Sequence, residues 1–246
     1  MAEGWTEFVL EQFGFPYTLL KDADIKKGNL NKDYDVIIIP DDSIGLITGE
    51  EKELKKWFET RGKMMGITSA EYYPPEYRSG LGEEGTEALK SFVEEGGTLL
   101  ALSEACNYAI EKFGLPVKNA VKDLPQKDYC CPGSTLKLTV DNCHPLAYGM
   151  PEDSQVLVSV TSPVFNLEPS NFSERCEIVV HYPEGRDPEH SLLQSGWLIG
   201  EEKLYGKSAM LSVKHERGKV ILIGFDPCFR GQTQGVFKLA FNCLLS

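Results

Sequence analysis

The feature that most constrains the fold of this chain is a short run of β-branched residues with no polar residue among them. Residues 36–39 read Val-Ile-Ile-Ile, and Pro40 followed by Asp41 and Asp42 ends the run. A strand with one face in water alternates apolar and polar residues, whereas this run is apolar on both faces. We therefore expect a buried strand over 36–39 in a parallel sheet whose two faces are both covered.

Apolar strands of this kind alternate with helical patterns along the chain. Further strands are expected at 98–102, directly after Gly96-Gly97, and at 219–225. Helices are expected over 4–14, 50–60, 83–95, 104–113 and 233–244. This alternation is typical of right-handed βαβ units. The sequence thus predicts a doubly wound α/β core with a mostly parallel sheet.

Before the last core strand the pattern changes to a series of shorter strands. Strand-like runs occupy 135–140, 155–160, 176–182 and 208–214, and His215-Glu216-Arg217-Gly218 has the composition of a hairpin turn. We expect a β-rich segment over about 130–215, inserted within a single domain that spans 1–246. A chain of 246 residues with 41% hydrophobic content is long enough to bury the core of such a domain.

Composition excludes some classes of partner. The chain has 25 Lys and Arg against 37 Asp and Glu, a net charge of −12, and its basic residues are scattered. Nucleic acid is not expected as a partner, because it requires a concentrated positive face. No apolar run reaches the ~20 residues of a membrane span, and no signal peptide pattern follows Met1. We expect a soluble protein, without a cofactor, that could form a homo-oligomer.

Cysteine and histidine provide weak candidates for a metal site. The seven Cys residues include no C-x-x-C pair, and the odd number favours free thiols. His181 and Glu184 have a zinc-peptidase spacing, but Pro183 and Gly185 place them in a turn. Cys130 and Cys131 are adjacent, so in an extended segment their side chains point to opposite sides. We predict no metal site from these residues.

Candidate ligand-binding residues follow the ends of the expected core strands. Ligands of open α/β sheets bind outside the carboxyl ends of the strands, so Asp41 and Ser103 are candidates. The loop after the last strand contributes Arg230, Gln232 and Thr233, just before the expected helix at 233–244. Because N–H groups at a helix N-terminus favour an anion, this loop predicts a small anionic ligand. Alternatively, Arg230 pairs with an acidic residue.

A loop rich in Tyr, Pro and Gly at 72–82 is a candidate wall of the same crevice. Tyr77 and Arg78 are the residues that we expect to contact a ligand. The alternative is a surface loop stiffened by its prolines.

Ser103 is also a candidate nucleophile. It lies between a strand and a helix, with small residues, Ala101 and Ala105, on both sides, as a strained nucleophile turn requires. Its partners would be Asp226 or Glu104, because none of His144, His181, His190 and His215 follows a core strand. The alternative is that Ser103 or its neighbour caps the helix.

Several ordered motifs resemble one family over almost the whole chain. These motifs are Glu3-Gly4-Trp5-Thr6, Phe13-Gly14-Phe15-Pro16-Tyr17, Tyr34-Asp35-Val36-Ile37, the segment 92–99, the segment 144–151, Ser195-Gly196-Trp197 and Phe229-Arg230-Gly231-Gln232-Thr233. Together they resemble the C-terminal domain of bacterial zinc carboxypeptidase-like proteins, a class I glutamine amidotransferase-like domain. The resemblance implies a flavodoxin-like fold, an upstream peptidase domain as partner and an exported protein, although the chain itself leaves the compartment open.

The resemblance also implies what this chain lacks. Class I glutamine amidotransferases have Cys in the strand-to-helix turn and His-Pro-Glu after the last core strand. Here the matching positions are Ser103 and Asp226-Pro227-Cys228. We therefore predict a non-glutaminase, with a ligand-binding or accessory role. The alternatives are a small serine hydrolase that uses Ser103, and a subunit interface formed by the 72–81 loop and the β-rich segment.

The beginning of the chain departs from the family pattern as well. The fold begins with a strand before its first helix, whereas this sequence begins on the helix expected at 4–14. We expect that a strand is missing from the centre of the sheet and that Met1 is an internal methionine, either of a longer protein or of a gene with a misassigned start.

Overall fold

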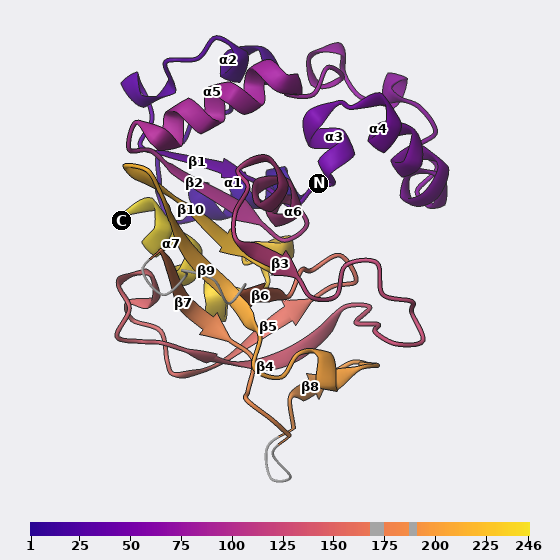
Figure 1. Ribbon diagram of the computed structural model, residues 1–246, viewed down its shortest axis with the longest axis vertical. Helices are drawn as coiled ribbons and strands as arrows, with labels where there is room; N and C mark the ends of the chain where they lie inside the picture. Colours follow the sequence, from indigo (N-terminus) through magenta and orange to yellow (C-terminus); the bar gives the residue numbers. More distant parts are fainter. Residues whose placement is uncertain (168–174, 187–190) are drawn as a thin grey trace.

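The computed structural model describes residues 1–167, 175–186 and 191–246, and its strands form one mixed ten-stranded sheet (Figure 1). The main path runs β1-β2-β10-β9-β7-β4-β5. Its strands are β1 (Val36–Ile39), β2 (Thr98–Leu102), β10 (Gly218–Ile223), β9 (Ser208–His215), β7 (Cys176–His181), β4 (Ser134–Val140) and β5 (Asp153–Val158). Three short strands branch from it: β3 (Val117–Asn119), β6 (Phe165–Leu167) and β8 (Leu193–Ser195).

Parallel pairing is confined to one end of this sheet. β2 pairs in parallel with β1 and with β10, and the other described strand pairs are antiparallel. The expected α/β core with a β-rich insertion is therefore present, but the sheet is mixed, and the prediction that it is mostly parallel is wrong. The tight turn at 215–218 joins β9 to β10, and because a tight turn can only reverse the chain, these two strands are antiparallel.

The α-helices described are α1 (Ala2–Gln12), α2 (Asp22–Lys26), α3 (Ile44–Thr48), α4 (Glu51–Trp57), α5 (Gly82–Glu94), α6 (Ala105–Lys112) and α7 (Phe237–Leu244). The expected helix bounds agree with these within a few residues, except at the start of α7. That helix begins at Phe237 after a 3₁₀ turn over Gln234–Val236, so residue 233 precedes the helix by a full turn.

Both faces of the parallel strands are covered, as the apolar runs predict. Leu99 and Ala101 pack in one cluster with side chains of α5 and α6, whereas Leu100 and Leu102 pack in a second cluster with α7 and the β-rich segment. All five residues of β2 are buried. Consecutive residues of a strand point to opposite faces, so β2 anchors both layers and fixes the position of the loop that follows it.

The expectation of a missing central strand is wrong. β1 pairs directly with β2 over four residues, and β2 pairs directly with β10 over five. The described sheet is continuous from β1 to β5. Within the described ranges, no helix is long and apolar enough to cross a membrane.

Candidate functional site

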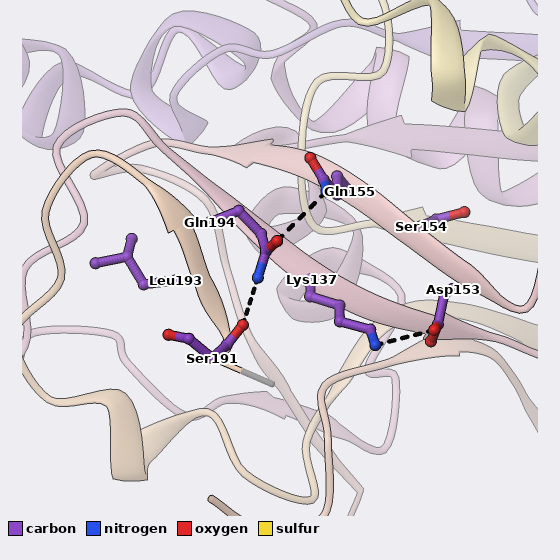
Figure 2. Close-up of a pocket in the computed structure, with 7 residues that line it drawn as sticks. All are labelled: Lys137, Asp153, Ser154, Gln155, Ser191, Leu193 and Gln194. Carbon is purple, nitrogen blue, oxygen red and sulfur yellow. Dashed lines mark hydrogen bonds and ion pairs between the residues drawn. The ribbon is translucent and has the colours of Figure 1, made fainter. Parts of the chain in front are cut away.

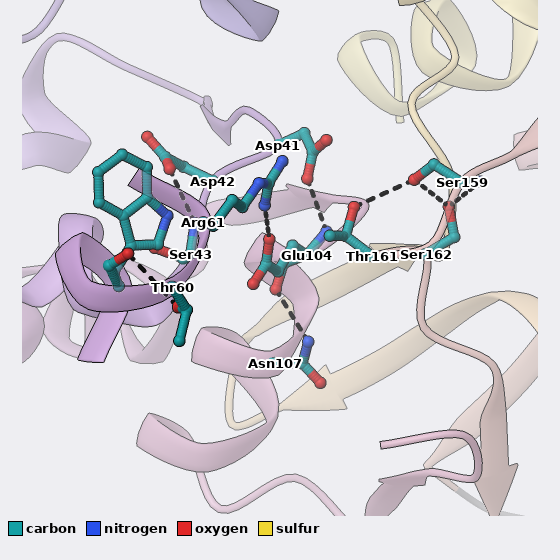
Figure 3. A network of polar contacts seen from close by, with 11 residues as sticks. Asp41, Asp42, Ser43, Thr60, Arg61, Glu104, Asn107, Ser159, Thr161 and Ser162 are labelled. Carbon is teal, nitrogen blue, oxygen red and sulfur yellow. Dashed lines mark hydrogen bonds and ion pairs between the residues drawn. The ribbon is translucent and has the colours of Figure 1, made fainter. Parts of the chain in front are cut away.

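The loops after β1, β2 and β10 bring four carboxylates to one end of the parallel strands. Asp41 and Asp42 follow β1, Glu104 follows β2, and Asp226 follows β10. These strands are neighbours in the sheet, so their carboxyl ends meet at the same edge. Asp41 Oδ1 accepts the backbone N–H of Glu104 at 3.0 Å, which ties the first two loops together (Figure 3).

A single guanidinium, that of Arg61, lies next to these acids and pairs with one of them. Arg61 lies in a π-helical turn, Phe58–Gly62, that continues α4, and its Nη1 forms an ion pair with Glu104 Oε2. Figure 3 shows the Arg61 side chain pointing to Glu104 beside Asp41. We call Asp41, Asp42, Arg61, Glu104 and Asp226 the carboxyl-end cluster. With four acidic groups and one basic group, it is net negative when the acids are ionised.

Burial raises the pKa of the carboxyl groups in this cluster. Desolvation is the main cause for Asp226, whose pKa rises to about 6, with a smaller contribution from the charge of Asp41. Desolvation also raises the pKa of Asp42 to about 6, against the N–H of Ser43, which lowers it. Asp42 is nevertheless open to solvent. Asp42 is therefore crowded by protein atoms while part of its side chain still contacts solvent.

Two opposing effects also set the pKa of Glu104, and here the opposing group is a positive charge. Desolvation raises the pKa of its carboxyl, and the adjacent Arg61 lowers it. The Glu104 side chain is 24% exposed and that of Arg61 43%, so the ion pair is partly open to solvent. Desolvation and the charge of Asp42 also raise the pKa of the Tyr73 phenol, which places this ring close to the cluster.

The Ser103 turn has a left-handed backbone like that of a nucleophile turn, but its hydroxyl is buried. Ser103 has φ 49°, a left-handed value that L-residues adopt rarely, and its N–H donates to Ile223 O at 2.7 Å. The side chain is 1% exposed, and its hydroxyl has no hydrogen-bond partner in the described chain. Of the two residues expected to cap α6, the N-cap position is held by the neighbour, Glu104, and no side chain makes a cap hydrogen bond there.

The donor that an acyl-transfer site needs is already occupied. In nucleophile-turn enzymes, the backbone N–H after the nucleophile stabilises the oxyanion. In this chain that N–H belongs to Glu104, and it donates to the Asp41 carboxylate at 3.0 Å. A carboxylate held at this position repels a developing oxyanion.

No described histidine hydrogen-bonds Ser103. His144 Nδ1 accepts the N–H of Leu146 at 3.1 Å and so caps the 3₁₀ turn that begins at Pro145. His181 Nδ1 lies 2.9 Å from Tyr182 O, and the His215 ring packs against Phe113 at 5.7 Å. His190 lies outside the described residues.

A chain of amides links the carboxyl-end cluster to the β-rich segment. Asn107 Nδ2 donates to Glu104 O at 3.2 Å, and Asn119 Nδ2 donates to Asn107 Oδ1 at 3.0 Å. Asn119 Oδ1 in turn accepts the N–H of Val164, which follows the hydroxyl-rich turn 159–162 drawn in Figure 3. The insertion therefore helps to hold the Glu104 turn, a role that isolated Asn residues do not reveal in the sequence.

The other residues predicted to bind a ligand lie apart from one another. Arg78 donates from Nε to Tyr73 O at 2.6 Å and from Nη2 to Glu71 O at 3.1 Å, so it binds its own loop. The Tyr77 ring lies 5.9 Å from Lys21 Nζ, on the α2 side. In this aromatic loop, Tyr73 is the residue whose phenol pKa is raised by the charge of Asp42.

Three further residues predicted to bind a ligand follow Asp226 in the loop after β10. Arg230 is exposed, and its guanidinium lies 5.3 Å from the ring of Phe229. Gln232 is exposed, and Thr233 Oγ1 donates to Pro227 O at 2.5 Å. Because α7 begins only at Phe237, this loop does not form the N-terminus of the helix, which was the basis for predicting an anion here.

A separate polar pocket lies on the β-rich segment. It has a volume of about 490 Å³ and is lined by Lys137, Asp153, Ser154, Gln155, Ser191, Leu193 and Gln194 (Figure 2). Lys137 Nζ pairs with Asp153 Oδ2 at 2.9 Å, so the charges of this pocket satisfy each other.

Metal-binding residues are not gathered in the described part of the chain. No group of three or more His, Cys, Asp or Glu side chains there is arranged to hold a metal ion. The seven cysteines are unpaired, and all except Cys143 are buried.

Comparison with known proteins shows which structures have a fold similar to that of this chain. No family model and no curated protein matches the chain. A cytoplasmic protein from Salmonella typhimurium matches with a TM-score of 0.54 and 13% identity, over 100% of this chain and 86% of its own. A ThuA-like protein from Bacteroides uniformis matches with a TM-score of 0.50 and 15% identity, over 98% of this chain and 80% of its own. A protein from Thermoplasma acidophilum, described as a GMP synthase component, matches with a TM-score of 0.52 and 11% identity, over 99% of this chain and 87% of its own.

At identities this low, the likeness concerns the fold alone. It supports the amidotransferase-type core that the motifs imply, whereas none of these matches bears on a carboxypeptidase. The chain therefore has a glutamine amidotransferase-like fold, similar to that of ThuA-like proteins and of the GMP synthase component.

Proposed function

We propose that this chain is a glutamine amidotransferase-like domain that does not hydrolyse glutamine and that binds a small cationic ligand at the carboxyl-end cluster. The contact between Asp41 Oδ1 and the Glu104 N–H supports this proposal most directly. It places a carboxylate where an acyl-transfer enzyme needs a free donor, and it adds to the negative charge at the same strand ends.

The charge of the cluster supports a cationic ligand. Four carboxylates and one guanidinium lie at the ends of β1, β2 and β10, and the pKa values of Asp42 and Asp226 are about 6. At pH 7.5 both groups are mostly ionised although burial disfavours the charge. An amine bound beside these carboxylates would compensate their charges, so its binding is favoured.

Two unpartnered hydroxyls next to the cluster also support a polar ligand. Ser43 directly follows Asp42, and Ser103 directly precedes Glu104. Both hydroxyls are buried and lack a hydrogen-bond partner in the described chain. Buried polar groups in proteins are nearly always satisfied, and a ligand or an ordered water would satisfy them here.

A matched set of four-carbon probes tests the proposal. We expect 1,4-diaminobutane to raise the melting temperature at low ionic strength, because it binds only the folded state. Neutral 1,4-butanediol and anionic succinate should have no such effect. The variant Asp42→Asn with Asp226→Asn should lose the response to the diamine. An equal response to all three probes would contradict a cation site.

Hydrolysis by Ser103 is a second candidate, favoured by one observation, the strained φ of 49°. The candidate also needs an exposed hydroxyl and a base, and the structure supplies neither around Ser103. We expect a fluorophosphonate probe to label neither the folded protein nor Ser103→Ala. Labelling that disappears in Ser103→Ala would establish the hydrolase instead.

Two predictions from the sequence remain proposals of their own. An accessory role beside a carboxypeptidase-like domain is supported by the motifs alone, and co-purification with such a domain tests it. A small anion at Arg230 is supported by the exposed guanidinium, and succinate binding that Arg230→Gln abolishes would show it.

A further inference from the structure

A second candidate site lies at the opposite end of the parallel strands, where β2 and β10 begin. A pocket of about 380 Å³ opens there, and Figure 1 shows the C-terminus at this end of the sheet. Its lining consists of Gly96, Thr98, Arg175, Glu177, Ser212, Lys214, Arg217, Gly218, Lys219 and Ser246. The carboxyl-end cluster shares no residue with this lining.

The pocket is basic in a chain that is acidic overall. Arg175, Lys214, Arg217 and Lys219 line it, although Asp and Glu outnumber Lys and Arg by 37 to 25 in the sequence. Across the described ranges, none of these four side chains has a carboxylate partner within 4.0 Å. The positive charges of these four side chains are therefore not neutralised by a salt bridge within the described ranges.

The one acidic side chain in this lining is engaged elsewhere. Glu177 Oε2 lies 3.2 Å from His144 Nε2, outside the set of four cations. It therefore does not neutralise the Lys and Arg side chains by direct contact.

Two of the lysines are held against each other by the sheet. Lys214 of β9 and Lys219 of β10 are directly opposite in the antiparallel register. Directly opposed residues place their side chains on the same face, and like charges there destabilise the pair. An anion between the two ammonium groups would remove this repulsion.

The backbone at the pocket is fixed rather than adaptable. A Cβ added to Gly218 would lie 2.2 Å from Val93 O and 2.3 Å from Gly97 O, so the hairpin end is packed against the turn between α5 and β2. Arg217 Nε donates to Glu94 O at 3.1 Å, which holds the base of the guanidinium in place. Such pre-ordering lowers the entropic cost of binding a ligand.

Neutral donors lie beside the cations. Thr98 and Ser212 are 4% and 5% exposed and line the same pocket. Hydroxyl donors together with Lys and Arg are the groups that bind the several acceptor oxygens of a phosphoryl group.

We propose that this pocket binds a small phosphate-bearing molecule. The four cations supply the charge, the hydroxyls of Thr98 and Ser212 supply neutral donors, and the ligand compensates the opposed lysines. This site is independent of the proposed function at the carboxyl-end cluster.

Calorimetric titration with inorganic pyrophosphate at low ionic strength tests the proposal. We expect saturable binding by the full chain, weakened about tenfold by Lys214→Gln or by Lys219→Gln, since each removes a charge-assisted hydrogen bond. Lys203→Gln is the matched control, because Lys203 pairs with Glu202 at 3.5 Å away from the pocket and its loss changes the net charge equally. This control should bind pyrophosphate as the wild type does.

Stability without ligand provides the second readout. Lys214→Gln should unfold at a higher urea concentration than the wild type, because it relieves the opposed charges. The proposal is overturned if pyrophosphate does not bind the folded wild type, or if Lys203→Gln weakens binding as much as the pocket variants do.

Discussion

Asp41 and Glu104 belong to loops that are 63 residues apart in the sequence, and the Asp41 carboxylate accepts the Glu104 backbone N–H at 3.0 Å. This bond holds together the ends of β1 and β2. We expect Asp41→Ala to lower the free energy of unfolding by about 1–3 kcal/mol, because the Glu104 N–H loses its acceptor. Asp41→Asn keeps an acceptor oxygen and should cost less. Urea unfolding of both variants measures the difference, and equal losses would contradict this account of the bond.

The orphaned hydroxyl of Ser103 leads to a prediction of the opposite sign. The hydroxyl is buried and unpartnered in the described structure, so Ser103→Ala should raise the free energy of unfolding by about 1 kcal/mol. For a chain of this size, that corresponds to an increase of about 2–4 °C in melting temperature. Calorimetry checks it. A lower melting temperature would mean that the hydroxyl is bonded in solution.

Asp226 should make stability depend on pH. Its pKa is raised to about 6 in the folded protein, so the native state binds more protons than the unfolded state between about pH 4 and pH 6. Its contribution is therefore present at low pH and is lost as the pH rises through 6. Asp226→Asn cannot ionise and keeps the acceptor for the N–H of Cys228. We expect it to be more stable than the wild type at pH 7 by about 3 kcal/mol, and equally stable at pH 4.

Unfolding in urea at both pH values measures this effect. The same substitution at an exposed carboxylate, Glu83→Gln, serves as a control for the general change in charge. A stability difference between Asp226→Asn and the wild type that does not change with pH would show that Asp226 is not desolvated.

Thiol reactivity should distinguish one cysteine from the other six. Cys143 is exposed, whereas the others are buried, and burial raises the pKa of the Cys228 and Cys243 thiols to about 12. We expect one equivalent of a thiol reagent to react rapidly with the native protein and seven with the unfolded protein. Cys143→Ser should abolish the rapid phase. A rapid phase that persists in this variant would show that the core opens.

The strand ends were predictable from the sequence because apolar runs have sharp limits. The runs at 36–39 and 98–102 coincide with β1 and β2, so Asp41 and Ser103 follow the strand ends as expected, and their role in ligand binding stays a prediction. The sequence also indicated the strained geometry of that turn through its small neighbours, Ala101 and Ala105.

The remaining members of the cluster depend on tertiary contacts that leave no local signal. Arg61 reaches Glu104 from a π-helical turn 43 residues earlier, and nothing in the pattern around it distinguishes it from other surface basic residues. The start of α7 was misjudged because residues 234–236 form a 3₁₀ turn, whose side-chain spacing resembles that of an α-helix. The hairpin at 215–218 predicts the antiparallel pairing of β9 and β10, whereas the longer connections between the other inserted strands leave their direction open in the sequence.

The most direct test of the account is the titration of the Asp42 and Asp226 carboxyl carbons by NMR, with and without 1,4-diaminobutane. In the free protein we expect both to titrate with a pKa of about 6. A bound diamine favours the charged carboxylates, so both pKa values should fall on saturation. Carboxyl groups that titrate at the same pKa with and without saturating diamine would contradict a cationic ligand site at the carboxyl-end cluster.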